Sequence, residues 1–153
     1  MNGEKCTVKR YIPLYKVRLI NDGSVLADRK IVKGPDDAYQ IMRGYFDDLA
    51  CEHFVALMLN TKNHVIGIAP ISVGSINATI VHPRELFLPL IQNLAASAIL
   101  IHNHVSGDPS PSPEDLSLTK KLLDCSRQLD ISLLDHLIIG DGCYVSLKEQ
   151  GIL

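Results

Sequence analysis

The sequence has no tryptophan, few aromatic residues and no long hydrophobic run. Aromatic residues make up 5% of the 153 positions, so the basic residues lack the aromatic partners on which nucleic-acid bases stack. The formal net charge is −2, which argues against an extended DNA-binding surface and leaves only a local contact open. No apolar run approaches the roughly 18 residues of a membrane span, so no membrane association is expected.

Cysteines are few and widely spaced. Cys6, Cys51, Cys125 and Cys143 form no C-x-x-C pair. The first residues also lack the apolar stretch and the small-residue cleavage site of a signal peptide. We therefore expect reduced thiols in a cytoplasmic protein, and the spacing gives no support to a cysteine nucleophile.

The composition that remains is typical of a folded globular protein, with 46% hydrophobic and 21% charged residues. A chain of this length has room for one domain with a sizeable core. We expect a flexible N-terminal arm over residues 1–14 and a single domain over residues 15–153, without internal repeats.

Turn signals and hydrophobic periodicity predict the order β-β-α-β-β-α-β-α-β-β. The predicted strands cover residues 15–20, 24–32, 52–59, 64–71, 97–101, 131–139 and 143–147, and the predicted helices begin at residues 35, 83 and 113. The strand at 97–101 is continuously apolar, which favours a central position with both faces buried. Pro89 predicts a kink or a break in the second helix. This order favours a mixed α/β sheet with helices packed against it.

The loop after the apolar strand carries a candidate metal site. His102 and His104 are one residue apart in an extended segment, so their rings point to the same side. Two imidazoles on one side can chelate a divalent metal, and a catalytic zinc also needs a third protein ligand and an open position for water. Asp115 supplies a carboxylate if the proline-rich loop folds back.

Each part of this pattern also has an ordinary structural explanation. Ser112, Pro113 and Asp115 form a capping box at the start of a helix, which accounts for Ser112 and Asp115 without a metal. An isolated His-x-His pair near a loop is common. The cap and the metal site are compatible, because Ser112 can cap the helix and still face the site.

The combined spacing matches the H-x-H-x7-S-x2-D signature of the JAMM metalloproteases, with His102, His104, Ser112 and Asp115 at its fixed positions. The chain resembles the RadC-like branch of the JAB/MPN fold from residue 15 onward, and most densely from Glu52. Further matches are Asn103, Ser106-Gly107-Asp108-Pro109, Pro83-Arg84-Glu85, Asp135-His136 and Gly151-Ile152-Leu153. The resemblance implies a three-layer, cytidine-deaminase-like fold in which helices flank a mixed sheet.

The resemblance also implies a set of site residues. One zinc ion per chain would be held by His102, His104 and Asp115. Glu52 would take a proton from the attacking water and pass it to the leaving group, and Ser112 would donate a hydrogen bond to the developing oxyanion. Without the motif, Glu52 is more simply a solvated strand end.

Two features differ from the family pattern. Val105 stands where relatives commonly have proline, which removes no ligand but leaves the course of the loop open. Only the predicted hairpin and first helix precede Glu52, so the helix-hairpin-helix module of full-length relatives is not expected here. A DNA-repair role therefore receives little support from the resemblance.

Several polar residues near the motif have no role that the sequence decides. Asn103 and Asp108 are candidates for shaping the loop. His136 is expected to be a core histidine, or one that hydrogen-bonds a metal ligand, rather than a ligand itself. The other histidines are expected at the surface: His53, His64 and His82.

The main hypothesis is a zinc-dependent hydrolase of the JAMM type that cleaves a peptide or isopeptide bond in a protein or peptide substrate. The alternative is a non-catalytic JAB-type binding module, or an accessory protein in DNA repair and other DNA transactions. A metal-dependent nuclease is a third and weaker hypothesis.

Overall fold

The computed structural model describes residues 13, 16, 20–24, 31–47, 49–74 and 81–153. All of the predicted arm except Pro13, and most of the predicted hairpin over residues 15–32, lie outside this part of the chain. Of the hairpin, the turn is described, where Asn21 Oδ1 accepts a hydrogen bond from the Gly23 N–H at 3.0 Å. Ile31 forms an isolated bridge with His64.

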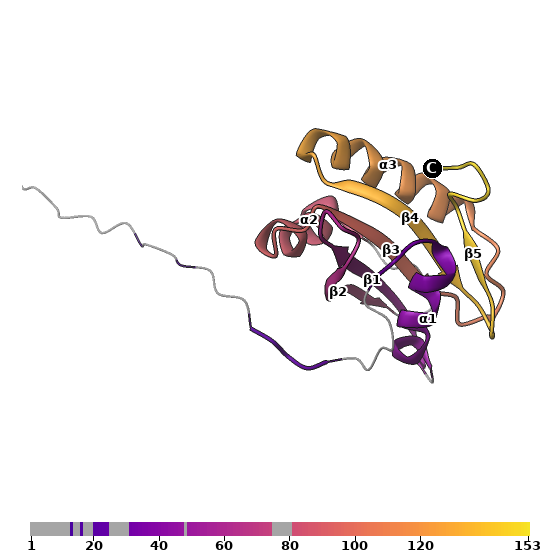
Figure 1. The fold of residues 1–153 in the computed structure, drawn as a ribbon. Helices are drawn as coiled ribbons and strands as arrows, with labels where there is room; N and C mark the ends of the chain where they lie inside the picture. The colour runs from indigo at the N-terminus through magenta and orange to yellow at the C-terminus, as the bar shows by residue number, and fades with distance from the viewer. Residues whose placement is uncertain (1–12, 14–15, 17–19, 25–30, 48, 75–80) are drawn as a thin grey trace, which may run out of the picture.

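The described residues form three helices and five strands (Figure 1). The helices are α1 (Pro35–Phe46), α2 (Pro83–Gln92) and α3 (Pro113–Leu129), and the strands are β1 (Glu52–Leu59), β2 (Val65–Gly74), β3 (Ser97–Asn103), β4 (Ser132–Ile139) and β5 (Tyr144–Ser146). Within the described segments, no helix is both long and apolar enough to cross a membrane. Three of the cysteines, Cys51, Cys125 and Cys143, are free thiols as expected, and Cys6 lies outside the described residues.

The strands form one mixed sheet in the order β2-β1-β3-β4-β5. β1 runs antiparallel to both β2 and β3, β3 is parallel to β4, and β4 is antiparallel to β5. Every residue of β3 is buried, which confirms the central position predicted from its apolar run. Because β3 and β4 are parallel, the chain crosses between them through α3.

Two apolar clusters lie on opposite faces of the sheet and give a helix–sheet–helix arrangement. One cluster joins the sheet to α2 and α3, and it includes Phe54, Ala56, Met58, Ala98, Leu100, Leu86, Leu90 and Leu122. The other joins the sheet to α1, and it includes Val55, Leu57, Leu59, Ile99, Ile101, Ala38, Ile41 and Met42. The even-numbered residues of β1 and β3 therefore face α2 and α3, as the period of two requires. The predicted α/β fold with flanking helices is confirmed.

Pro89 does not end the second helix. Of the kink or break predicted there, the break is absent, because α2 continues through Pro89 to Gln92. Proline removes the hydrogen bond to the carbonyl of Glu85, but Glu85 is exposed, so water can satisfy that carbonyl. The carbonyl of Pro89 itself accepts a hydrogen bond from the Asn93 N–H at 3.0 Å, which closes the last turn.

Truncation of Leu122 tests the packing of α3 on the sheet. This side chain is fully buried in the cluster shared with α2, so Leu122→Ala should lower the free energy of unfolding by about 2–5 kcal/mol. The exposed Lys120→Ala on the same helix should change it by no more than about 0.5 kcal/mol. Urea unfolding of both variants measures the difference, and equal losses would contradict this packing.

Candidate metal centre

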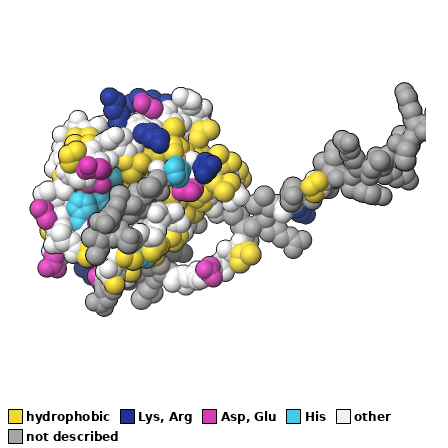
Figure 2. Space-filling view, turned by 180° about the vertical axis from the view of Figure 1, so that it is seen from behind, with side chains coloured by type: hydrophobic (Ala, Val, Ile, Leu, Met, Phe, Trp, Pro, Cys, Tyr) yellow, Lys and Arg dark blue, Asp and Glu magenta, His cyan; other side chains and the backbone are white. Residues whose placement is uncertain are grey.

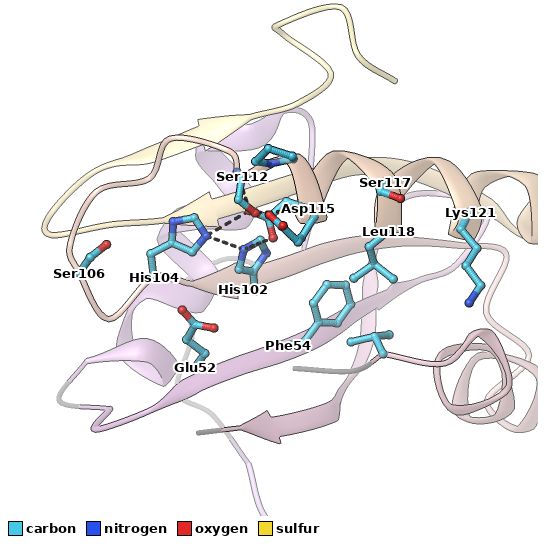
Figure 3. Close-up of a pocket in the computed structure, with 13 residues that line it drawn as sticks. Glu52, Phe54, His102, His104, Ser106, Ser112, Asp115, Ser117, Leu118 and Lys121 are labelled. Atoms are coloured by element: carbon cyan, nitrogen blue, oxygen red, sulfur yellow. Dashed lines mark hydrogen bonds and ion pairs between the residues drawn. The ribbon is translucent and has the colours of Figure 1, made fainter. Parts of the chain in front are cut away.

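The three candidate ligands come together at the edge of the sheet where β3 ends. His102 is the last residue but one of β3, His104 follows the strand, and Asp115 is in the first turn of α3. Figure 3 shows the two imidazoles and the Asp115 carboxylate pointing toward one another. The loop between them folds back, as the sequence required for Asp115 to join the histidines.

Their ligand atoms are close enough to share one ion. His102 Nε2 lies 3.0 Å from His104 Nε2 and 3.2 Å from Asp115 Oδ1. His104 Nε2 lies 3.3 Å from Asp115 Oδ2. Each residue offers one ligand atom, and the three atoms lie within 4.8 Å of one another. His102, His104 and Asp115 could therefore hold a metal ion.

The hydrogen bond on the far side of His104 fixes which of its ring nitrogens carries the proton. His104 Nδ1 lies 2.7 Å from the backbone carbonyl oxygen of Asp108. A carbonyl oxygen only accepts, so Nδ1 is the donor and the neutral ring has a lone pair on Nε2. That lone pair faces a second ring nitrogen and a carboxylate. A cation among these acceptors would stabilise them, and a metal ion is such a cation.

Asp115 belongs both to this cluster and to the cap of α3. Ser112 Oγ donates to Asp115 Oδ2 at 2.6 Å, and it accepts from the Asp115 N–H at 3.1 Å. Burial alone would raise the pKa of the Asp115 carboxyl, but its polar contacts outweigh burial and hold that pKa well below its usual range; the Ser112 hydroxyl and backbone N–H both donate to Oδ2, at 2.6 and 2.8 Å. The carboxylate is therefore ionised at neutral pH. Asp115 therefore belongs both to the capping box and to the candidate metal site, which the sequence left compatible.

Glu52 reaches the same edge of the sheet because β1 runs antiparallel to β3. Phe54 pairs with His102, so the first residue of β1 lies beside the last residues of β3. Glu52, the histidines and Asp115 line one pocket of about 870 Å³. In Figure 3 the Glu52 carboxylate lies beneath the two imidazoles.

Asn103 holds the backbone on both sides of Glu52. Its Oδ1 accepts from the His53 N–H at 2.8 Å, and its Nδ2 donates to the Cys51 carbonyl at 3.2 Å. Asn103 itself lies between the two candidate histidine ligands in the chain. It therefore ties the position of Glu52 to that of the imidazoles, a role that the sequence did not decide.

The loop that carries His104 is tethered despite Val105. The His104 N–H donates to the Ile139 carbonyl at 2.9 Å, and the Gly107 carbonyl accepts from the Asp141 N–H at 2.8 Å. Val105 is largely exposed. These bonds to the β4–β5 turn define the course of the loop without the proline of the family pattern.

Residues outside the motif complete the surroundings. His136 is fully buried, and its Nε2 lies 2.8 Å from His102 Nδ1, which agrees with the prediction that it contacts a ligand. Thr119, a buried hydroxyl one helical turn after Asp115, also lies here, and no motif in the sequence marks it. The prediction of a surface position is wrong for His53, which is half-buried with Nδ1 3.1 Å from the Tyr45 hydroxyl. His64 and His82 are exposed as predicted.

Comparison with known proteins agrees with this geometry. The model of the RadC-like JAB domain family matches residues 32–152. The chain belongs to this family. The resemblance to the RadC-like JAB domain that the motif indicated is thus confirmed.

Relatives of the RadC-like JAB domain include UPF0758 proteins of bacteria and an archaeon. One from Shouchella clausii is 54% identical over 123 residues, which are 80% of this chain and 54% of that protein. One from Clostridium acetobutylicum is 52% identical over 122 residues, 80% of this chain and 53% of that protein. One from Methanococcoides burtonii is 49% identical over 125 residues, 82% of this chain and 55% of that protein. The chain spans about half the length of these curated relatives.

Substitution of Gly140 tests whether the turn after β4 positions the loop that carries His104. A Cβ at this position would clash with the Gly107 carbonyl oxygen and lie 2.7 Å from Pro109 Cδ, so Gly140→Ala must displace the loop. We expect zinc affinity to fall by about 10-fold or more, measured by competition with a chromophoric chelator. Gly34→Ala is the control, because its Cβ would meet no atom within 4 Å. Unchanged affinity in Gly140→Ala would show that the loop does not depend on this contact.

Proposed function

We propose that this chain is a zinc-dependent hydrolase that cleaves a peptide or isopeptide bond. The observation that carries the proposal is the convergence of two imidazole nitrogens and an ionised carboxylate in a pocket that also contains Glu52. Two histidines and one carboxylate are a ligand set that suits zinc and leaves a position for water. The family match supports the same reading.

Zinc bound by His102, His104 and Asp115 would act as a Lewis acid that acidifies water and polarises the substrate carbonyl. The chain itself supplies the base. The Glu52 carboxylate makes no hydrogen bond or ion pair among the residues that the structure describes, so it is available for a proton. It takes one proton from the attacking water as the oxygen–carbon bond forms, and it returns that proton to the amide nitrogen as the carbon–nitrogen bond breaks.

Ser112 is the proposed donor to the oxyanion. Its hydroxyl has one hydrogen, which is donated to Asp115 Oδ2 in this structure. The oxyanion role therefore requires the hydroxyl to rotate away from Asp115 once a cation shares the charge of that carboxylate. The N-terminal turn of α3, in which Ser112 is the cap, also favours negative charge.

The pocket extends from the ligands along α3. Phe54 and Leu118 form apolar walls, and Lys121 lies at the far end (Figure 3). A substrate segment with an apolar side chain next to the scissile bond fits these walls.

Leu118→Asp tests this fit. The charged side chain should raise the KM of such a substrate and leave kcat little changed. A fall in kcat with KM unchanged would place the substrate elsewhere.

Glu52→Gln tests the proposed base. The amide keeps the shape of the side chain but cannot take the proton, so zinc should be retained while turnover falls by about 100-fold or more. Turnover is measured with zinc-loaded protein on a library of fluorogenic peptides and isopeptide-linked peptides. Full activity of Glu52→Gln on a substrate that the wild-type protein cleaves would exclude this role.

Asn103→Ala tests whether the position of Glu52 matters as well as its charge. Without the bonds to the backbone of Cys51 and His53, Glu52 should shift, and kcat should fall by about 10- to 100-fold. Zinc affinity should change much less, because the ligands are held by other bonds. Asn103→Asp retains the acceptor for the His53 N–H and should lose less activity than Asn103→Ala. A fall in zinc affinity as large as the fall in kcat would assign Asn103 to the metal site instead.

A non-catalytic binding module is the second candidate, and one observation favours it. Leu88 and Ile91 of α2 and Leu129 of α3 are large exposed apolar residues that line one groove. In Figure 2, acidic and basic side chains are both present among hydrophobic ones on the face shown, so this face offers no continuous basic surface to support the DNA-transaction and nuclease hypotheses. A partner protein that binds wild-type and zinc-free protein equally, together with the absence of hydrolysis across the library, would favour the binding module.

A further inference from the structure

We propose that Thr119 and His136 are positioning residues that fix the tautomer of His102, and so keep the lone pair of His102 Nε2 directed at the metal. Neither residue belongs to the signature motif, and neither lies among the candidate ligands. The inference rests on the metal site of the proposed function, but it does not depend on the reaction that the site performs.

The direction of the first hydrogen bond follows from the chemistry of Thr119. Its Oγ1 lies 2.6 Å from the Asp115 backbone carbonyl and 2.6 Å from His136 Nδ1. A carbonyl oxygen only accepts, so the single hydroxyl hydrogen goes to Asp115. The hydroxyl oxygen must then accept from His136, which places a hydrogen on His136 Nδ1.

His136 passes this constraint to His102. The ring is completely buried, and its two nitrogens face the Thr119 hydroxyl and the His102 ring rather than a carboxylate, so the cost of burying a charge keeps it neutral. A neutral imidazole has one N–H, and here it is on Nδ1, which leaves Nε2 as an acceptor. His102 Nδ1 lies 2.8 Å from that acceptor and must be the donor. The lone pair of His102 is therefore on Nε2, which faces His104 and Asp115.

The surroundings of these residues allow no easy substitute for the hydrogen bonds. His136 is completely buried and Thr119 is 1% exposed. The Phe54 ring lies parallel to His102 at a centroid distance of 5.8 Å and edge-on to His136 at 5.4 Å. The Asp135 carboxylate holds the backbone N–H of His136 at 2.7 Å. Water has little access, so a changed hydrogen-bond direction cannot be satisfied by solvent.

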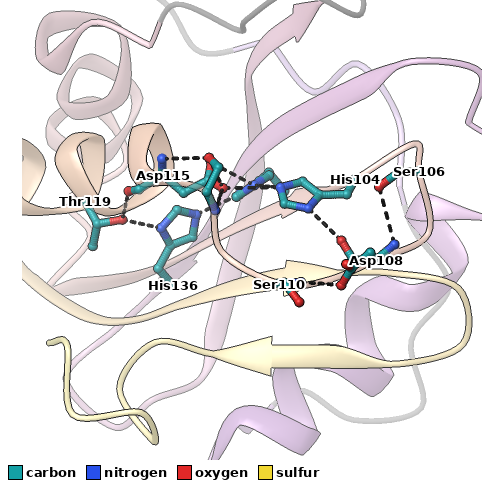
Figure 4. A network of polar contacts seen from close by, with 9 residues as sticks. His104, Ser106, Asp108, Ser110, Asp115, Thr119 and His136 are labelled. Carbon is teal, nitrogen blue, oxygen red and sulfur yellow. Dashed lines mark hydrogen bonds and ion pairs between the residues drawn. The ribbon is translucent and has the colours of Figure 1, made fainter.

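The contacts form a closed circuit, much of which is visible in Figure 4. Asp115 accepts from Thr119 through its carbonyl and faces His102 through its carboxylate. Asp115 thus accepts the first of these hydrogen bonds through its backbone carbonyl, and its carboxylate provides the ligand atom that faces His102. His104 needs only the Asp108 carbonyl for the same purpose, whereas His102, inside the sheet, needs two side chains.

Thr119→Val removes the hydroxyl without changing the shape of the side chain. His136 Nδ1–H then loses its acceptor, and the alternative tautomer, with hydrogen on Nε2, becomes favourable. That hydrogen would face His102 Nδ1 and move the His102 proton to Nε2, where it can approach Asp115 Oδ1 and oppose metal binding. We expect zinc affinity to fall by about 10- to 100-fold. Thr119→Ser retains the hydroxyl and should restore both the tautomer and the affinity.

The experiment measures the metal and the proton separately, without substrate. Nitrogen-15 NMR of ring-labelled histidines in the metal-free protein, at a pH of about 8.5 where exposed histidines are neutral, reports which nitrogen of His102 carries hydrogen. Chelator competition gives the zinc affinity, and thermal unfolding shows how much stability each variant loses. Hydrogen on His102 Nδ1 in the wild type and in Thr119→Ser, with a shift to Nε2 in Thr119→Val, is the expected result.

Two results would overturn the inference. One is a Thr119→Val protein that retains the His102 tautomer and the wild-type zinc affinity. The other is an equal loss of zinc affinity in Thr119→Val and Thr119→Ser, since that would reflect packing alone. If Thr119→Val does not fold, the pair His136→Gln and His136→Leu replaces it. Glutamine keeps an acceptor for His102 and should bind zinc more tightly than leucine, and equal binding would contradict the inference. A chain that hydrolyses nothing but shows the tautomer shift would refute the proposed function and leave this inference standing.

Discussion

The candidate site depends on the mutual approach of two histidine nitrogens and one carboxylate at the edge of the sheet. His102 Nε2 and His104 Nε2 lie 3.0 Å apart, and both are within 3.3 Å of Asp115. Facing acceptors of this kind repel one another unless a cation lies among them. Other contacts hold the end of β3 and the start of α3 in place, and they offset the repulsion between these acceptors. The apolar clusters on both faces of the sheet supply the rigidity that such a site requires.

Topology explains why residues far apart in the sequence meet there. The parallel pair of β3 and β4 brings the loop after β3 beside the turn after β4, and ligand sites in α/β sheets commonly lie at such carboxyl ends. The antiparallel β1 begins at the same edge and delivers Glu52. Asn103 then links the backbone around Glu52 to the strand of His102. Glu52 and the candidate ligands are thus parts of one framework rather than of separate loops.

Much of this arrangement could be predicted from local signals. The apolar run before His102 indicated a central strand, and the spacing of His102, His104, Ser112 and Asp115 indicated the site and the family. The roles of Asn103 and Thr119 could not be predicted, because they depend on which strands are adjacent and on the face that α3 presents. The half-buried position of His53 also depends on tertiary contacts, since its partner Tyr45 is on α1. The helix continues through Pro89 because Glu85, whose carbonyl loses its hydrogen bond there, is an exposed residue within reach of water, and sequence alone does not reveal that exposure.

The most direct test of the account is the zinc content of the purified protein, measured by elemental mass spectrometry beside His104→Ala. The protein is purified without chelators and then equilibrated with zinc and desalted. The account predicts one zinc ion per chain in the wild type and its loss in the variant, because His104 supplies one of three ligand atoms. A wild-type protein that binds no zinc even after this loading would contradict it. Ser112 and Asp115 would then serve only as the cap of α3.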